Sequence, residues 1–184
     1  MNRKCGSCRL CCKLLPVRDN LVNVLKDAGE RCRHEFVGGC RVYHKAGFPL
    51  ACGVWSCLWL TDEDTAELKR PDRTGYVLDA LPDIVTFENS DTGEKTEITC
   101  MQVWVDPIRP DAWRDPALLR YGERLAEHGV ALLLRYSSTR ATLAVAPAMN
   151  GTSEWRLSRN SIMEESVTGS RLLDRALAAG ELTG

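Results

Sequence analysis

Cysteine is crowded into the N-terminal third of this chain, and no other feature constrains its fold as much. Of the nine cysteines in 184 residues, eight lie within the first 57. Four of them form one short run with the spacing C-x2-C-x2-C-C. The eight residues that we consider as metal ligands are Cys5, Cys8, Cys11, Cys12, Cys32, Cys40, Cys52 and Cys57. The sequence therefore predicts that the N-terminal part holds metal.

The expected compartment decides how these thiols are interpreted. Met1-Asn-Arg-Lys leads directly into Cys5, without the apolar segment or small-residue cleavage site of a signal peptide. No apolar run approaches the roughly 20 residues that cross a bilayer. We therefore expect a cytoplasmic protein with no membrane span. In a reducing compartment, dense cysteines favour metal ligation over a disulfide framework or unliganded redox thiols.

The cysteine spacing leaves the metal open between zinc and iron. A C-x2-C turn lets two thiolates of one loop meet one ion, so we expect Cys5 and Cys8 to share an ion. Cys52 and Cys57 are expected to share another, with Cys40 as a further candidate. All-thiolate tetrahedra and the irregular later spacing favour zinc. The C-x2-C-x2-C opening is instead similar to the start of an iron–sulfur run.

Other residues of this segment have two interpretations each. Cys11 and Cys12 are adjacent and rarely suit the same ion, so they are expected to face different centres, or one ligates while the other packs. His34 and His44 lie among the later cysteines and could each supply a nitrogen ligand. Because thiolates are already plentiful, we favour solvated loop histidines.

Large apolar residues surround the last cysteine of the cluster. Trp55 and Trp59 flank Cys57 and are expected to form an apolar shell that anchors the N-terminal lobe and limits solvent access. Cys100 lies apart, in the middle of an expected strand. We interpret it as a small buried hydrophobic residue rather than as a nucleophile.

Three segments together resemble a known family. They are the C-x2-C-x2-C-C-K run that begins at Cys5, Cys40-Arg-Val-Tyr43, and Pro49-Leu-Ala-Cys52. Over roughly residues 5–60, the chain resembles the YkgJ-type cysteine-cluster family, which is described as a zinc- or iron-chelating domain. Related cysteine motifs occur in flagellin lysine N-methylase, which is linked to an iron–sulfur centre. The resemblance implies a metal-chelating N-terminal lobe.

Charge is divided unevenly along the chain, although the net charge is only −1. Residues 1–57 contain ten basic and four acidic residues, a formal charge of +6, and residues 58–184 carry −7. A basic lobe can indicate nucleic-acid binding. We favour another interpretation, in which Arg and Lys offset the negative charge of thiolate-ligated metal. The acidic remainder also argues against a nucleic-acid partner.

The pattern of strands and helices predicts an α+β fold, with an irregular cysteine-rich, metal-bound lobe packed on a small, largely antiparallel sheet. We expect the lobe at 1–60, a helix and linker at 61–75, and a hairpin–helix–hairpin–helix region at 76–184. The expected strands are 76–81, 84–88, 96–105, 130–136 and 141–146, with a turn at 89–93. The expected helices are 19–29, one opened by the segment 61–64 and ended at 70–71, one from Pro116 to the stop at Gly129, and 161–182.

Three functions are compatible with the cysteine pattern and the expected fold. The first is a metal-binding protein in which closed thiolate sites are mainly structural and the α+β part recognises a protein partner. The second is an iron–sulfur protein with redox or methyl-transfer-related activity. The third is a nucleic-acid-binding zinc module. The sequence has no dinucleotide fingerprint, P-loop, H-E-x-x-H or G-x-S-x-G motif, so an enzymatic role has no motif to support it.

Overall fold

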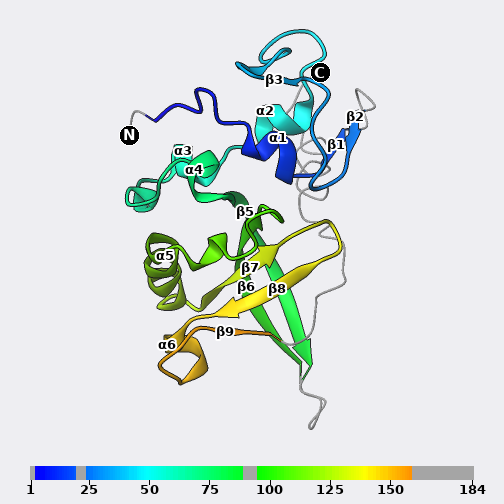
Figure 1. The fold of residues 1–184 in the computed structure, drawn as a ribbon. Coiled ribbons are helices and arrows are strands. Elements are labelled where there is room, and N and C mark those ends of the chain that lie inside the picture. Colours follow the sequence, from blue (N-terminus) through cyan, green and yellow to red (C-terminus); the bar gives the residue numbers. More distant parts are fainter. Residues whose placement is uncertain (1–2, 20–23, 89–94, 159–184) are drawn as a thin grey trace.

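A computed structural model describes residues 3–19, 24–88 and 95–158 of the chain. Figure 1 shows an irregular N-terminal lobe, coloured blue to cyan, above a sheet and its helix, coloured green to yellow. The sheet has five strands in the order β5-β6-β7-β8-β9, and two small two-stranded sheets lie in the lobe. Helices with a separate mixed sheet confirm the α+β class.

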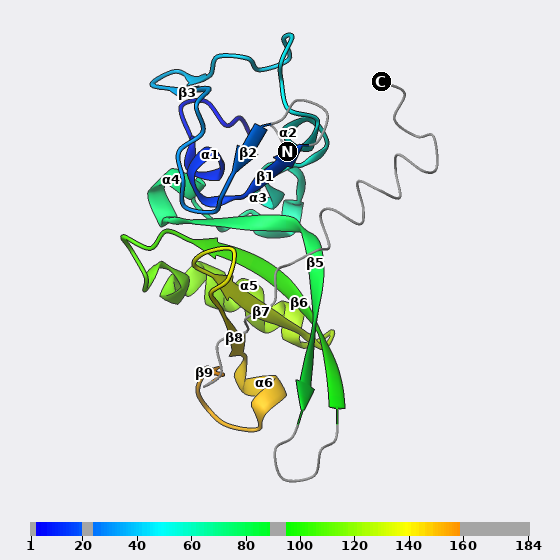
Figure 2. The ribbon, with the colours of Figure 1, turned by 90° about the vertical axis from the view of Figure 1, so that its right-hand side faces the viewer.

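A long hairpin forms one edge of the large sheet. Strand β5 (Tyr76–Glu88) pairs antiparallel with β6 (Lys95–Val105), and the register shifts between Leu78 and Pro82. In Figure 2, β5 runs beneath the lobe before it turns down beside β6. The predicted hairpin is confirmed, although its first arm is one bulged strand rather than two. The expected turn at 89–93 lies outside the described residues.

Helix α5 (Pro116–Ala126) begins where the sequence predicts. The Asp115 carboxylate accepts a hydrogen bond from the Ala117 amide at 3.0 Å, and Pro116 takes the first helical position, where its missing N–H costs nothing. Leu118 and Tyr121 of this helix are buried in the same core cluster as sheet residues. This helix covers one sheet face and supplies much of the core.

The prediction of an antiparallel sheet is wrong for one strand pair. Strand β7 (Val130–Arg135) runs parallel to β6, with Thr99 opposite Val130. The connection between them contains α5, and a strand–helix–strand crossover returns the chain in the same direction. The pairs β5-β6, β7-β8 and β8-β9 are antiparallel, so most of the sheet follows the expectation.

The far side of the sheet is completed by β8 (Ala141–Val145) and β9 (Arg156–Leu157), with the short helix α6 (Pro147–Asn150) between them. Strand β8 confirms the expected strand, whereas α6 and β9 were not predicted. Leu132 and Leu134 of β7 are fully buried between α5 and the neighbouring strands. The sheet therefore has a continuous apolar core.

The lobe is built from much shorter elements. They are α1 (Leu10–Leu14), β1 (Val17–Asp19), β2 (Val24–Lys26), β3 (Glu35–Phe36), β4 (Gly39–Cys40) and α2 (Leu50–Val54). Strands β1 and β2 pair antiparallel, as do β3 and β4. None of these elements exceeds five residues, so turns and loops carry most of this part of the chain.

The helix expected at 19–29 is wrong. Its C-terminal part forms β2, in which Lys26 lies opposite Val17 and Val24 lies opposite Asp19. A helix of about ten residues is marginal on its own, so pairing with an available strand can override its sequence signals. The Lys26 ammonium is buried and donates to the carbonyl oxygens of Lys13 and Asp27, at 3.0 Å each, and of Leu15.

The segment between lobe and sheet also differs from the prediction. Instead of one helix over 61–71, it contains α3 (Leu58–Thr61), a 3-10 turn η1 (Glu63–Thr65) and α4 (Pro71–Thr74). Asp62, not Thr61, caps the 3-10 turn. Pro71 begins a helix rather than ending one, because proline suits the first helical position. Gly75 then ends α4 with a positive φ of 90°.

Polar contacts join the lobe to the rest of the molecule. Lys13 of α1 donates to both carboxylate oxygens of Asp106, at 2.7 and 2.9 Å, just beyond the end of β6. Arg3 donates to the Thr65 hydroxyl and carbonyl at 2.8 and 2.9 Å. Leu14 packs in the same buried cluster as sheet residues. The lobe is therefore fastened at several points.

Two further predictions concern a C-terminal helix and membrane-spanning helices. The helix predicted at 161–182 lies outside the described residues. Within the described ranges, no helix combines the length and the apolar character that crossing a membrane requires.

Candidate metal centre at the thiol pocket

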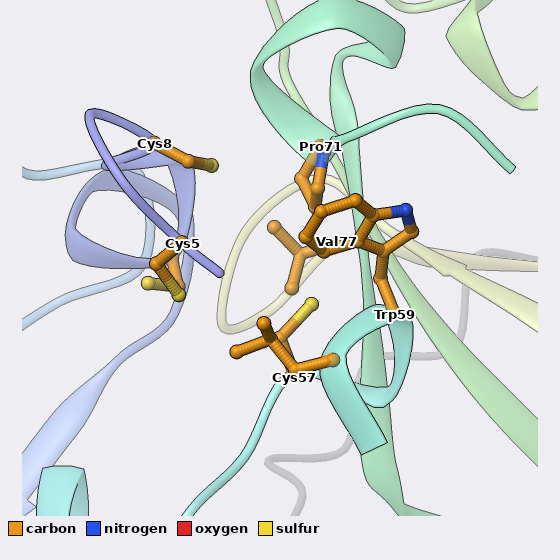
Figure 3. A pocket seen from close by; sticks show the side chains of 8 residues that line it. Cys5, Cys8, Cys57, Trp59, Pro71 and Val77 are labelled. Atoms are coloured by element: carbon orange, nitrogen blue, oxygen red, sulfur yellow. The ribbon is translucent and has the colours of Figure 1, made fainter. Parts of the chain in front are cut away.

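Four of the eight candidate cysteines line one small pocket between the lobe and the sheet. Cys5, Cys8 and Cys11 come from the N-terminal run, and Cys57 comes from the segment just before α3. In Figure 3, Cys5 and Cys8 lie on one side of the pocket and Cys57 on the other. The remaining walls are apolar and are formed by Trp59, Leu60, Pro71 and Val77.

The N-terminal run is folded into a tight turn followed by a helix. The Cys8 amide donates to the Cys5 carbonyl at 2.9 Å, and Gly6 between them has a φ of 53°. A left-handed residue in this turn favours glycine. Cys11 lies in the helix α1 that follows this turn, and it also lines the pocket. The C-x2-C-x2-C spacing therefore brings three thiols to one place.

Cys57, the fourth cysteine of the pocket, is positioned by a backbone bridge to the sheet. It forms an isolated antiparallel bridge with Asp79 of β5 and is the residue before α3, with only 6% of its surface exposed. Burial raises the pKa of its thiol to about 12. The structure thus places Cys57 beside the N-terminal cysteines, although it is 46 residues from Cys11 in the sequence.

A buried carboxylate behind Cys57 organises the apolar shell. Asp79 accepts hydrogen bonds from the indole N–H of Trp55 at 2.7 Å and of Trp104 at 3.1 Å. The Leu81 amide also donates to it at 3.1 Å. Burial raises the pKa of Asp79, while these donors oppose that effect. Asp79 could not be identified from the sequence, because nothing in its local pattern shows that two distant indoles converge on it.

The environment of the pocket thiols combines burial with a nearby cation. Cys5 is exposed by surface area, but partial desolvation of its thiol, followed by the charges of Cys8 and Cys12, raises its pKa. Burial also raises the pKa of Cys8, and in both cases Arg70 acts in the opposite direction. Arg70 is held by Asp72 at 2.7 and 2.8 Å and lies over the turn that contains Gly6. A fixed guanidinium here would offset negative charge on metal-bound thiolates.

Cys11 lines the pocket, whereas the adjacent Cys12 does not. A hydrogen bond between their thiols lowers the pKa of Cys12 to about 7 and, together with burial, raises that of Cys11. The charge of Glu35 raises the pKa of Cys12, and the charges of Lys26 and Arg9 lower it; none of these three residues lines the pocket. Only Cys11 therefore belongs to the pocket group.

Cys32 lies on the Cys12 side. Its amide donates to the Cys12 carbonyl at 3.1 Å, and its carbonyl accepts from the Glu35 amide at 3.0 Å. Cys40 in β4 pairs across the small hairpin with Glu35. These links gather Cys12, Cys32 and Cys40 in one region of the lobe, but they do not form a closed donor set.

Cys52 and Cys57 were expected to share one ion, but the pocket includes only Cys57 of these two. Cys52 is in α2 and does not line the pocket, whereas Cys57 does. His44 is exposed and His34 is half-buried, and neither lines the pocket. Cys100 is fully buried in β6, and burial raises its pKa to about 12, in agreement with the interpretation of a core residue.

The donor chemistry of the pocket suits a soft metal, although its geometry is not that of a formed site. Within the described ranges, no group of three or more His, Cys, Asp or Glu side chains is arranged, as it stands, to hold a metal ion. Four thiols with no competing oxygen donor among the lining residues are nevertheless the ligand type that zinc and iron–sulfur clusters take.

Comparison of the chain with protein-family models, with curated proteins and with solved structures finds no match. The resemblance to the YkgJ-type family therefore stays a prediction from the cysteine motif.

Proposed function

We propose that the chain is a metal-binding protein in which Cys5, Cys8, Cys11 and Cys57 hold one metal centre. The observation that carries the proposal is the pocket, since four cysteines from two distant segments line it together with apolar side chains only. Zinc fits this set because four thiolates complete its tetrahedral shell and leave no open position for a reaction. The centre is then structural rather than catalytic.

The position of the pocket suggests what such a centre would do. Three of its thiols belong to the N-terminal run, and the fourth belongs to a residue bridged to β5. A metal bound to all four would cross-link the lobe to the sheet. Because the folded pocket brings the ligands together, part of the metal-binding free energy would stabilise the fold.

One observation favours an iron–sulfur cluster as a second candidate. The pocket groups the first three cysteines of a C-x2-C-x2-C run with one remote cysteine. In bacterial ferredoxins, the fourth cysteine of the run binds the other cluster, so three neighbouring thiolates and a distant one serve each cluster. The apolar walls would also limit solvent access to a cluster.

The test is metal content and the visible absorption spectrum of the untagged full chain, purified without oxygen. We expect Cys5→Ser, at an exposed position, and Cys57→Ser each to lose metal from the pocket. Cys100→Ala is the matched control, because Cys100 is a buried cysteine of the sheet that does not line the pocket. Its metal content should equal that of the unaltered chain.

The outcomes separate the candidates. Colourless protein with zinc that depends on Cys5 and Cys57 supports the structural zinc centre. Brown protein with iron and acid-labile sulfide supports the cluster instead. If Cys5→Ser folds and keeps its full metal content, the pocket is not the metal centre and the proposal is wrong.

A further inference from the structure

The outer end of the lobe exposes an unusual share of large apolar side chains. Among the described residues, seven large hydrophobic side chains are exposed, and four of them lie within residues 36–54. Their exposed fractions are 40% for Phe36, 82% for Val37, 59% for Tyr43 and 51% for Val54. Together with the half-buried Phe48, they form what we call the outer patch.

The outer patch is held in place by short hydrogen-bonded turns. The centroid of the Tyr43 ring lies 4.1 Å from that of the His44 ring and 5.4 Å from that of the Phe48 ring, which it meets edge-on. The backbone amide of Lys45 donates to the Val42 carbonyl, and the backbone amide of Phe48 donates to the Lys45 carbonyl. His44 has a φ of 51°, an uncommon conformation for a residue other than glycine. An ordered, exposed apolar surface loses little conformational entropy when it binds.

The second half of the patch lies at the small β3-β4 hairpin. Phe36 packs over Gly38, and the Arg41 guanidinium lies 5.9 Å from its ring centroid. On the other side, the Phe48 ring is near Gly53, which precedes Val54 in α2. Figures 1 and 2 both place the β3 region at the end of the molecule opposite the large sheet. The sheet does not cover this surface.

Basic side chains accompany these apolar residues without acidic partners. In the described part of the chain, no carboxylate pairs with Arg33, Arg41 or Lys45, all of which are exposed. The neighbouring Glu35 does not neutralise them, because its buried side chain already pairs with Arg9 and Arg31. The patch therefore combines apolar contact area with positive charge.

We propose that the outer patch binds an acidic protein segment that carries aromatic or aliphatic side chains. Asp and Glu of such a segment would meet Arg33, Arg41 and Lys45, while its apolar side chains would cover Tyr43 and Val37. Single-stranded nucleic acid fits less well. The Tyr43 and Phe48 rings contact each other instead of standing as separate platforms, and the valines offer nothing for a base to stack on.

The outer patch belongs to the lobe, and none of its residues lines the thiol pocket. The sequence led us to expect partner recognition by the α+β part. There, the exposed large apolar side chains are single and scattered, at Ile84, Ile108 and Leu157, and such residues need no special explanation. The lobe instead gathers four exposed large apolar side chains and three exposed basic ones within residues 33–54.

The test selects peptides from a random displayed library against the full chain and measures their affinities. We expect the selected peptides to be rich in Asp and Glu and to contain Leu, Phe or Trp, with binding that weakens as salt rises. Tyr43→Ser should weaken binding by about tenfold or more. Ile108→Ser, at a residue that is 79% exposed outside the patch, should leave affinity unchanged.

A charge variant gives a second reading. Arg41→Gln with Lys45→Gln should weaken binding and reduce its salt dependence, whereas Lys69→Gln, at another exposed lysine, should not. The proposal is overturned if no peptide is selected, if the peptides show no acidic excess, or if Tyr43→Ser and Ile108→Ser bind equally. If the chain binds oligodeoxythymidine and Tyr43→Ser abolishes that binding, the ligand of the outer patch is single-stranded nucleic acid and the proposal of a protein segment is wrong. Metal content should be the same in all of these variants, so failure here is separable from failure of the metal proposal.

Discussion

The lobe and the sheet reach a folded state by different means. Strands β5 and β6 have 13 and 11 residues, and α5 has 11, whereas α1 and α2 have five residues each. The sheet buries Leu118, Leu132 and Leu134 completely in a core of its own. The buried cluster of the lobe is completed by Val77 and Trp104, which belong to the sheet.

This difference shows what each region needs. A segment of about 60 residues buries only about 60% of the surface of its unfolded chain and is marginally stable by itself, and small domains of this kind commonly add a structural metal or cross-links. The lobe has the means for such a cross-link in its cysteines. The sheet has no such need, and Cys100, the one described cysteine outside the lobe segment, is a core residue there. The following predictions test this division.

Metal removal should have the largest effect and should act on one region only. If the thiol pocket holds a structural metal, a chelator should make amides of the lobe, such as that of Cys32, exchange at least about a hundredfold faster. The amides of β6 and β7 should exchange at the same rate as before. The measurement is hydrogen exchange of the full chain with and without chelator. Equal loss of protection in both regions would contradict the division.

Leu132→Ala should have the opposite regional effect. Leu132 is fully buried between α5 and the sheet, and its truncation is expected to lower the free energy of unfolding by about 2–5 kcal/mol. Denaturant titration measures this change. Ile84→Ala is the control, since Ile84 is 62% exposed in the same sheet and its loss should change stability by less than about 0.5 kcal/mol. Loss of metal from folded Leu132→Ala protein would show that the regions are not independent.

Lys13→Met should have the smallest effect and should depend on pH. Burial raises the pKa of Asp106, but the hydrogen bonds from Lys13 and the Ile108 amide, together with the charges of Lys13 and Arg109, outweigh burial, so the pKa lies below its ordinary value of 3.8. The ionised carboxylate is therefore favoured in the folded state. Its contribution is complete above pH 3.8 and is lost as pH falls through the lower, folded-state pKa. At neutral pH we expect Lys13→Met to cost about 1 kcal/mol.

The stability difference between Lys13→Met and the unaltered chain should shrink below about pH 4. Denaturant titrations over a range of pH measure it. Arg120→Met is the control, because Arg120 and Glu67 form an ion pair in which both side chains are more than half exposed. A difference that stays constant into acid would mean that Lys13 contributes through packing and not through its charge.

Local signals predicted much of the sheet and less of the lobe. The Asp115-Pro116 start of α5 was predictable because capping depends on neighbouring residues. The β5-β6 hairpin was predictable because β-branched residues fill both arms. The helix expected at 19–29 was wrong because a short segment with weak local preference took the structure that pairing with β1 offered.

The sequence by itself determined that eight thiols are concentrated in the first 57 residues and that the C-x2-C-x2-C run holds three of them within seven residues. It could not determine which distant cysteine joins them. Tertiary structure decided that Cys57, bridged to Asp79, faces the pocket while Cys52 does not. It also decided that β7 runs parallel to β6 and that Trp55 and Trp104 meet at one carboxylate. The physical reason is that spacing fixes contacts within a turn, whereas contacts between distant segments depend on how whole elements pack.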